Sequence, residues 1–154
     1  MLIQLGITHI PMGHLRDDLT LDILNARIGE NLPGYLGIAM TGFSEGEMTS
    51  RMELKKIHFA PNTYLHAGSI VTLADTTAGF GTYAHLPPGS KGFTTIELKS
   101  NFLGTLREGA IICISRAQHF GRNTQIWDAE VFDEATHRKL ALFRCSQMIL
   151  WPKE

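Results

Sequence analysis

The segment of residues 65–79, which reads LHAGSIVTLADTTAG, constrains this chain most. It has the composition of a helix that is apolar on all sides, and such a helix is normally buried. Its single charged side chain, Asp75, stands in the middle of the segment. Because an unpaired buried carboxylate is strongly destabilising, Asp75 must be hydrogen-bonded in a polar setting or serve chemistry. A purely structural carboxylate would be hydrogen-bonded to Thr72 or would cap a loop, and hydrogen bonds to Thr72 or Thr76 would oppose the rise in pKa that burial causes.

The remaining pattern predicts an antiparallel sheet around this helix. The predicted elements are a short amphipathic helix over 17–30, a turn over 31–34, the buried helix over 67–83, and strands over 35–43, 48–59, 92–102, 109–120, 123–132 and 139–150. The last four strands are joined by hairpin-scale connections, so we expect them to be antiparallel neighbours in chain order. The economical arrangement is an α+β fold in which one curved sheet covers one helix.

The strand predicted over 92–102 alternates with a period of two residues. One face would carry Thr94, Ile96, Leu98, Ser100 and Phe102, and the other Glu97, Lys99 and Asn101.

Composition narrows the class of protein. The 154 residues suffice for a single domain spanning 1–154, with residues 1–33 as an N-terminal extension that carries the short helix. A net charge of −1 gives no electrostatic reason to expect nucleic acid or a membrane as partner. We expect no secretory signal or membrane span, because the N-terminal segment has no long apolar core and no run of about 18 apolar residues occurs. Cys113 and Cys145 lie in strand-like runs, so we expect a cytoplasmic protein with reduced thiols. No histidine or cysteine cluster has the spacing of a metal site.

A motif at the start of the buried helix resembles that of the hotdog-fold acyl-coenzyme A thioesterases. It is His66-Ala67-Gly68, followed by an acidic residue nine positions after the histidine, Asp75. The similarity is to the branch of phenylacetic acid degradation and 4-hydroxybenzoyl-coenzyme A thioesterases. It spans residues 35–150 and includes the strand over 92–103 and the turns at 107–109 and 120–122.

Two positions depart from the family pattern. The first glycine of the family motif is Ala67 here, which keeps the backbone N–H that the family uses. Many members carry Gln or Asn where this chain has Ala60, and His58 or Asn62 are the nearby side chains that could replace that amide.

The resemblance implies an enzyme that hydrolyses an acyl- or aryl-coenzyme A thioester to the free acid and coenzyme A. It implies no metal or redox cofactor, since coenzyme A is part of the substrate, and a homotetramer built as a dimer of dimers. Two other functions stay open: a non-catalytic acyl-coenzyme A binding or sensor protein, which the missing amide at Ala60 favours, and a hotdog dehydratase or hydratase.

Thioester hydrolysis needs a nucleophile and a group that stabilises the oxyanion. The N–H groups of Ala67 and Gly68, at the positive end of the helix dipole, suit the oxyanion. Asp75 would activate water or attack the carbonyl itself, and burial would raise its pKa. His66 either shapes the pocket or simply caps the helix.

Three further residues are candidates for substrate binding. Asn62 is close to the motif. Thr95 occupies a position where relatives carry a small hydroxyl residue near the thioester, although threonine is also common in any strand. Arg122 follows a glycine in a turn, where it would bind a coenzyme A phosphate or remain solvated.

The nine-residue spacing predicts a shared site. Nine residues of helix turn through about 900° and rise about 13 Å, so Asp75 and the helix N-terminus cannot face the same carbonyl within one chain. Two antiparallel copies of the helix can bring them together. We therefore expect a two-fold homodimer whose active sites are shared between subunits.

Overall fold

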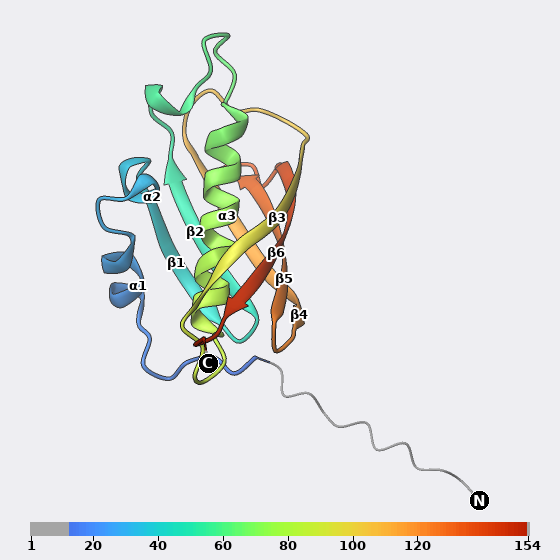
Figure 1. Ribbon diagram of the computed structural model, residues 1–154. Helices are drawn as coiled ribbons and strands as arrows, with labels where there is room; N and C mark the ends of the chain where they lie inside the picture. Colours follow the sequence, from blue (N-terminus) through green and yellow to red (C-terminus); the bar gives the residue numbers. More distant parts are fainter. Residues whose placement is uncertain (1–12, 154) are drawn as a thin grey trace, which may run out of the picture.

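The protein, in a computed structural model that describes residues 13–153, is one curved six-stranded antiparallel sheet wrapped around the long helix α3 (Ala67–Ala84) (Figure 1). The other helices are α1 (Leu21–Ile28), α2 (Leu32–Tyr35) and the 3-10 turn η1 (Lys56–His58). The strands are β1 (Ile38–Ser44), β2 (Glu47–Glu53), β3 (Gly92–Phe102), β4 (Ala110–Phe120), β5 (Thr124–Asp133) and β6 (Lys139–Leu150). The α+β arrangement expected from the sequence is confirmed.

The strand order is β1-β2-β4-β5-β6-β3, which corrects one expectation. β3 does not pair with β4, the strand that follows it, but with β6, where Thr95 lies opposite Gln147. Both edges of β4 are already occupied, by β2 and β5. The connection of residues 103–109 therefore passes β6 and β5 to reach β4, and β3 is an edge strand.

A β-bulge in β3 corrects the predicted alternation. Thr95 pairs with Gln147 and Glu97 pairs with Ser146, so Ile96 is left without a partner. One extra residue reverses the face that the preceding side chains point to. As a result Thr95, rather than Thr94, lies on the side of the buried Gln147, facing α3.

The core lies between α3 and the sheet. Ten residues of α3 are buried, and Trp127 of β5 is fully buried beside the helix. Gly81 makes room for this ring, since a Cβ atom there would stand 2.7 Å from Trp127. Cys113 and Cys145 are both free and buried, and burial raises the pKa of each thiol to about 12.

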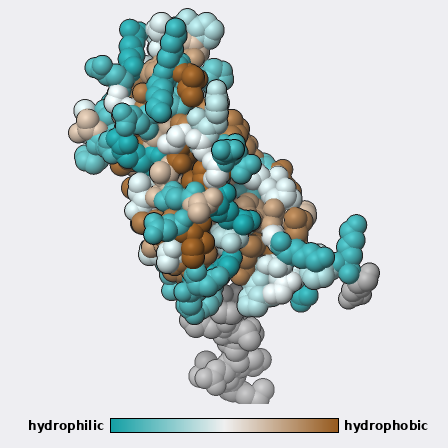
Figure 2. All heavy atoms as spheres, turned by 90° about the vertical axis from the view of Figure 1, so that its left-hand side faces the viewer, coloured by the Kyte–Doolittle hydropathy of each residue, from teal (hydrophilic) through white to brown (hydrophobic). Residues whose placement is uncertain are grey.

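The N-terminal segment differs from its predicted boundaries. α1 is shorter than the predicted 17–30, because Thr20 caps it by accepting the Ile23 N–H and Gly29 ends it with a positive φ. The predicted turn at 31–34 is mostly the short helix α2, with Pro33 in its first turn. Figure 2 shows the side of the molecule that bears α1 and α2, where a band of hydrophobic atoms lies between hydrophilic ones. Residues 1–12 lie outside the described part of the chain.

The second predicted strand, 48–59, ends early. β2 stops at Glu53, and η1 follows because the buried His58 ring is held from two sides. Its Nδ1 accepts the Lys55 N–H at 2.8 Å, and its Nε2 lies 2.8 Å from the Leu36 carbonyl oxygen. Both ring nitrogens are thus used inside the fold, so His58 is a structural residue.

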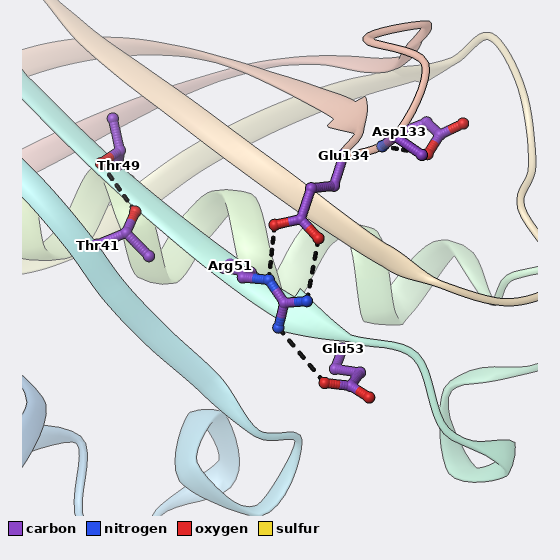
Figure 3. A network of polar contacts seen from close by, with 7 residues as sticks. Thr41, Thr49, Arg51, Glu53, Asp133 and Glu134 are labelled. Carbon is purple, nitrogen blue, oxygen red and sulfur yellow. Dashed lines mark hydrogen bonds and ion pairs between the residues drawn. The ribbon is translucent and has the colours of Figure 1, made fainter.

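The outer face of the sheet is charged. Arg51 of β2 makes a two-pronged ion pair with Glu134, just after β5, at 2.7 and 3.0 Å, and also reaches Glu53 (Figure 3). Such exposed pairs each contribute about 0–1 kcal/mol. None of the helices in residues 13–153 is long and apolar enough to cross a membrane.

Candidate active site

The N-terminus of α3 is an exposed cluster of backbone donors. His66 is the N-cap, and its Nδ1 accepts the Gly68 N–H at 2.8 Å. Its carbonyl oxygen accepts from the N–H groups of Ser69 and Ile70. Within residues 13–153, the Ala67 N–H has no hydrogen-bond partner. His66 therefore caps the helix, and of the two predicted oxyanion donors Ala67 is the unengaged one.

The loop before α3 fixes the direction of this helix end. The His58 carbonyl oxygen accepts two bonds, from the His66 N–H at 3.0 Å and from the Ser69 hydroxyl at 2.9 Å. Asn62 is exposed, and its side-chain oxygen accepts the Tyr64 N–H within the loop. Asn62 thus lies in the loop that leads into the helix N-terminus.

Asp75 lies about two turns further along α3 and is half-buried. The Thr95 hydroxyl donates to its Oδ1 at 3.3 Å, but the same hydroxyl lies closer, at 2.9 Å, to the Gln147 side-chain oxygen. One hydroxyl proton serves both acceptors, so the bond to Asp75 is weak. Neither of the two possible partners named from the sequence holds Asp75: Thr72 donates to the Gly68 carbonyl oxygen instead, and Thr76 makes no hydrogen bond to the carboxylate.

This environment changes the acidity of Asp75. Burial raises the pKa of its carboxyl above the usual value, and the Thr95 hydrogen bond lowers it only in part. A carboxylate with a raised pKa and one weak hydrogen bond has lone pairs left for a water molecule or a carbonyl carbon.

A pocket of about 270 Å³ opens beside Asp75. Five of its residues recur along one face of α3 at helical spacing. The walls are Asp75, Thr76, Gly79, Phe80 and Tyr83 of α3, Phe93 and Thr95 of β3, and Arg27 and Pro33 of the N-terminal segment.

The other predicted residues lie elsewhere. His66, Ala67 and Gly68 are at the far end of the same helix, about 13 Å of helical rise from Asp75. Arg122 lines a separate hollow of about 310 Å³ near the opposite end of α3, and its guanidinium lies 5.5 Å from the Trp151 ring centroid. In one chain, Thr95 is therefore the only one of the other predicted site residues that lies beside Asp75.

Sequence reasoning missed several residues of the pocket. Phe80 and Tyr83 stand five and eight positions after Asp75, so helical periodicity could have found them. Gln147 and Arg27 reach the site from β6 and α1, and no local pattern marks either of them.

Comparison with known proteins agrees with this architecture. The family model described as the thioesterase superfamily matches residues 62–139, about half of the chain, including α3, β3, β4 and β5. The chain belongs to the thioesterase superfamily, and the hotdog thioesterase resemblance of its sequence is confirmed.

Individual relatives give the same result. A 1,4-dihydroxy-2-naphthoyl-CoA hydrolase of Listeria monocytogenes is 30% identical over 112 residues, which cover 72% of this chain and 89% of that protein. The crystal structure of a mutant thioesterase from Pseudomonas aeruginosa has a TM-score of 0.83 at 26% identity, covering 88% of this chain and 97% of the other. The PaaI protein of the phenylacetic acid degradation operon of Escherichia coli shares the fold, with a TM-score of 0.73 at 20% identity over 85% of this chain and 96% of its own.

Proposed function

We propose that this thioesterase hydrolyses acyl- or aryl-coenzyme A thioesters to the free acid and coenzyme A. The observation that carries the proposal is the half-buried Asp75, with its raised pKa, at one end of a pocket in a thioesterase-superfamily fold. The relative from Listeria monocytogenes is named for hydrolysis of an aryl-coenzyme A. No metal or redox group is needed for this reaction.

Asp75 is the base that activates water, or the nucleophile itself. The Ala67 N–H donates a hydrogen bond to the oxyanion. The Gly68 N–H becomes a second donor when the His66 ring turns away and releases it. Thr95 holds the Asp75 carboxylate in position. Asn62 and Arg122 are proposed to contact the coenzyme A portion of the substrate.

These roles require two copies of the chain. Within one chain Ala67 and Asp75 are separated by about 12 Å of helical rise, too far for both to act on one carbonyl. In a two-fold dimer, the helix N-terminus of one copy faces Asp75 of the other. The edge strand β3 supports this pairing, because it exposes Ile96, Leu98 and Phe102 beside backbone groups that face no further strand of residues 13–153.

We propose the following organisation for the whole chain. The chain forms one domain with an N-terminal extension. Four chains assemble as a dimer of dimers, and the protein is located in the cytoplasm. The two free, buried cysteines support a reducing compartment.

The test is thiol release from a panel of acyl- and aryl-coenzyme A thioesters by the wild-type protein and by Asp75→Asn. We expect release by the wild type and its loss in the variant. Release that Asp75→Asn leaves intact contradicts the mechanism. Tight binding without turnover identifies a sensor, and hydration of an enoyl thioester identifies a hydratase.

The shared site has its own test, which uses two inactive variants. Ala67→Pro removes the proposed oxyanion donor at the first helical position, where proline is tolerated, and the extended conformation of His66 suits a following proline. Mixed dimers of Ala67→Pro and Asp75→Ala chains contain one site with both groups intact. We expect them to regain about half of the wild-type activity per dimer. No recovery in mixed dimers, isolated with two different tags, contradicts a shared site.

A further inference from the structure

The pocket beside Asp75 has a cation at its other end. Arg27 of α1 lines the pocket, and its guanidinium carbon lies 4.3 Å from the centroid of the Tyr83 ring. Tyr83 follows Asp75 by eight residues, a helical rise of about 12 Å. The pocket therefore runs along α3 from a carboxylate to a guanidinium.

Two arginines lie over the Tyr83 ring, and only one is neutralised. Arg16, at 4.7 Å from the ring centroid, is paired with Asp18 through two hydrogen bonds of 2.7 and 3.0 Å. Arg27 is exposed and takes part in none of the ion pairs of residues 13–153. A guanidinium stacked on a ring keeps its in-plane N–H donors available for a carboxylate. Arg27 thus carries a charge without a protein counter-ion at the pocket wall.

The space between the two charges is apolar. The half-buried rings of Phe80, Tyr83 and Phe93 line it, and Asp75 is its single acidic side chain. Gly79 adds no side chain to the helix side of the pocket, where a Cβ atom would be in van der Waals contact with the Phe93 ring at 3.4 Å. This arrangement suits an acyl group with an apolar body and a negative charge at its remote end.

We propose that Arg27 selects acyl groups whose end remote from the thioester carries a carboxylate. The inference rests on the proposed function, since it assumes that the thioester carbonyl lies at Asp75. Arg27 and Pro33 lie outside the region matched by the thioesterase family model, residues 62–139. The N-terminal extension would therefore set the substrate preference of a reaction that the shared domain performs.

The test compares two coenzyme A thioesters of equal carbon number, one from a linear dicarboxylic acid and one from a monocarboxylic acid, over a series of chain lengths. At the best length we expect the wild type to favour the dicarboxylic monothioester about tenfold in kcat/KM, because the charged hydrogen bond is partly solvent-exposed. Arg27→Gln should bring this ratio to about one, and Arg27→Lys should keep part of it. High salt should reduce the wild-type ratio.

Arg107→Gln is the matched control, since Arg107 is also exposed and also lies over a tyrosine ring, that of Tyr64, outside this pocket. It should leave the ratio unchanged. A wild-type ratio near one, or a ratio that survives Arg27→Gln, overturns the inference while leaving thioester hydrolysis intact. If no thioester is hydrolysed, the proposed function fails. The Kd ratio of the two non-hydrolysable thioether analogues then still decides whether Arg27 selects the carboxylate.

Discussion

Two polar clusters lie on the same helix, and they differ in how completely they are hydrogen-bonded. At the C-terminal end of α3, the buried His85 ring uses both nitrogens: Nδ1 lies 2.7 Å from the Gly81 carbonyl oxygen, and Nε2 accepts the Gly46 N–H at 3.0 Å. The His85 carbonyl oxygen accepts from Gln125, whose own oxygen accepts from Trp127. Every polar group named here has a partner, so this cluster serves the fold.

The cluster in the middle of α3 is incomplete. Asp75 has one hydrogen bond of 3.3 Å, and it shares the donor with Gln147. Its carboxylate also faces a pocket rather than the core. Burial alone therefore does not mark a functional residue, since His85 is more deeply buried than Asp75. The useful sign is a half-buried ionisable group whose hydrogen-bonding capacity the fold leaves partly unused.

The largest expected difference between the clusters is in activity. Asp75→Asn should lower kcat/KM by about 10²–10⁴-fold, the usual contribution of a general base. The melting temperature should stay the same or rise, because the amide removes a charge that burial disfavours. Activity assays and thermal unfolding at pH 7 check both parts. A clear fall in the melting temperature would show that Asp75 is structural, like His85.

The opposite result is expected for His85→Leu. This change leaves the Gly46 N–H and the Gly81 carbonyl without their buried partner, at a cost of about 3 kcal/mol in the free energy of unfolding, or roughly 6–12 °C in Tm. Because His85 does not line the pocket beside Asp75, kcat per folded molecule should remain within about twofold of wild type. Denaturant titration and an assay at low temperature measure the two quantities. Lost catalysis in a fully folded variant would contradict a purely structural role.

A smaller effect is expected at Thr95, which belongs to the incomplete cluster. Thr95→Val removes the hydrogen bond that lowers the pKa of Asp75, so the acid limb of the kcat/KM profile should move to higher pH. The Gln147 oxygen also loses a donor, which should cost about 1 kcal/mol of stability. Thr76→Val is the control, because Thr76 lines the same pocket but makes no hydrogen bond to Asp75. An acid limb that moves equally in both variants would refute the positioning role of Thr95.

The smallest effect concerns the pH dependence of stability, where the clusters have opposite signs. Burial lowers the pKa of His85 below 6.5, so its contribution to stability is complete above that pH and is lost as the pH falls through the folded-state pKa. Burial raises the pKa of Asp75 above 3.8, so its contribution is complete below that pH and is lost as the pH rises through the folded-state pKa. Unfolding free energies between pH 4 and 7 for wild type, His85→Leu and Asp75→Asn separate them. Equal slopes in all three proteins would exclude both assignments.

The elements with a strong local pattern could be predicted from the sequence. The boundaries of β3 and β6 match, and α3 differs by one residue at its C-terminal end. The position of β3 in the sheet could not be predicted, because pairing depends on which edges the other strands leave open. The hydrogen-bond donor to Asp75 could not be predicted either. Thr95 faces α3 because of the bulge at Ile96, and no local sequence pattern indicates that bulge.

The sequence by itself determined the buried helix, its single carboxylate and the donor cluster nine residues earlier, because these depend on spacing within one segment. The tertiary structure alone decided what else surrounds that carboxylate: Thr95 and Gln147 behind it, the Phe93 ring along the pocket, and Arg27 at the far end. These groups come from β3, β6 and α1, and only packing around α3 brings them together. Local periodicity places Asp75 on a helix, and the packing of distant segments around that helix builds the pocket beside it.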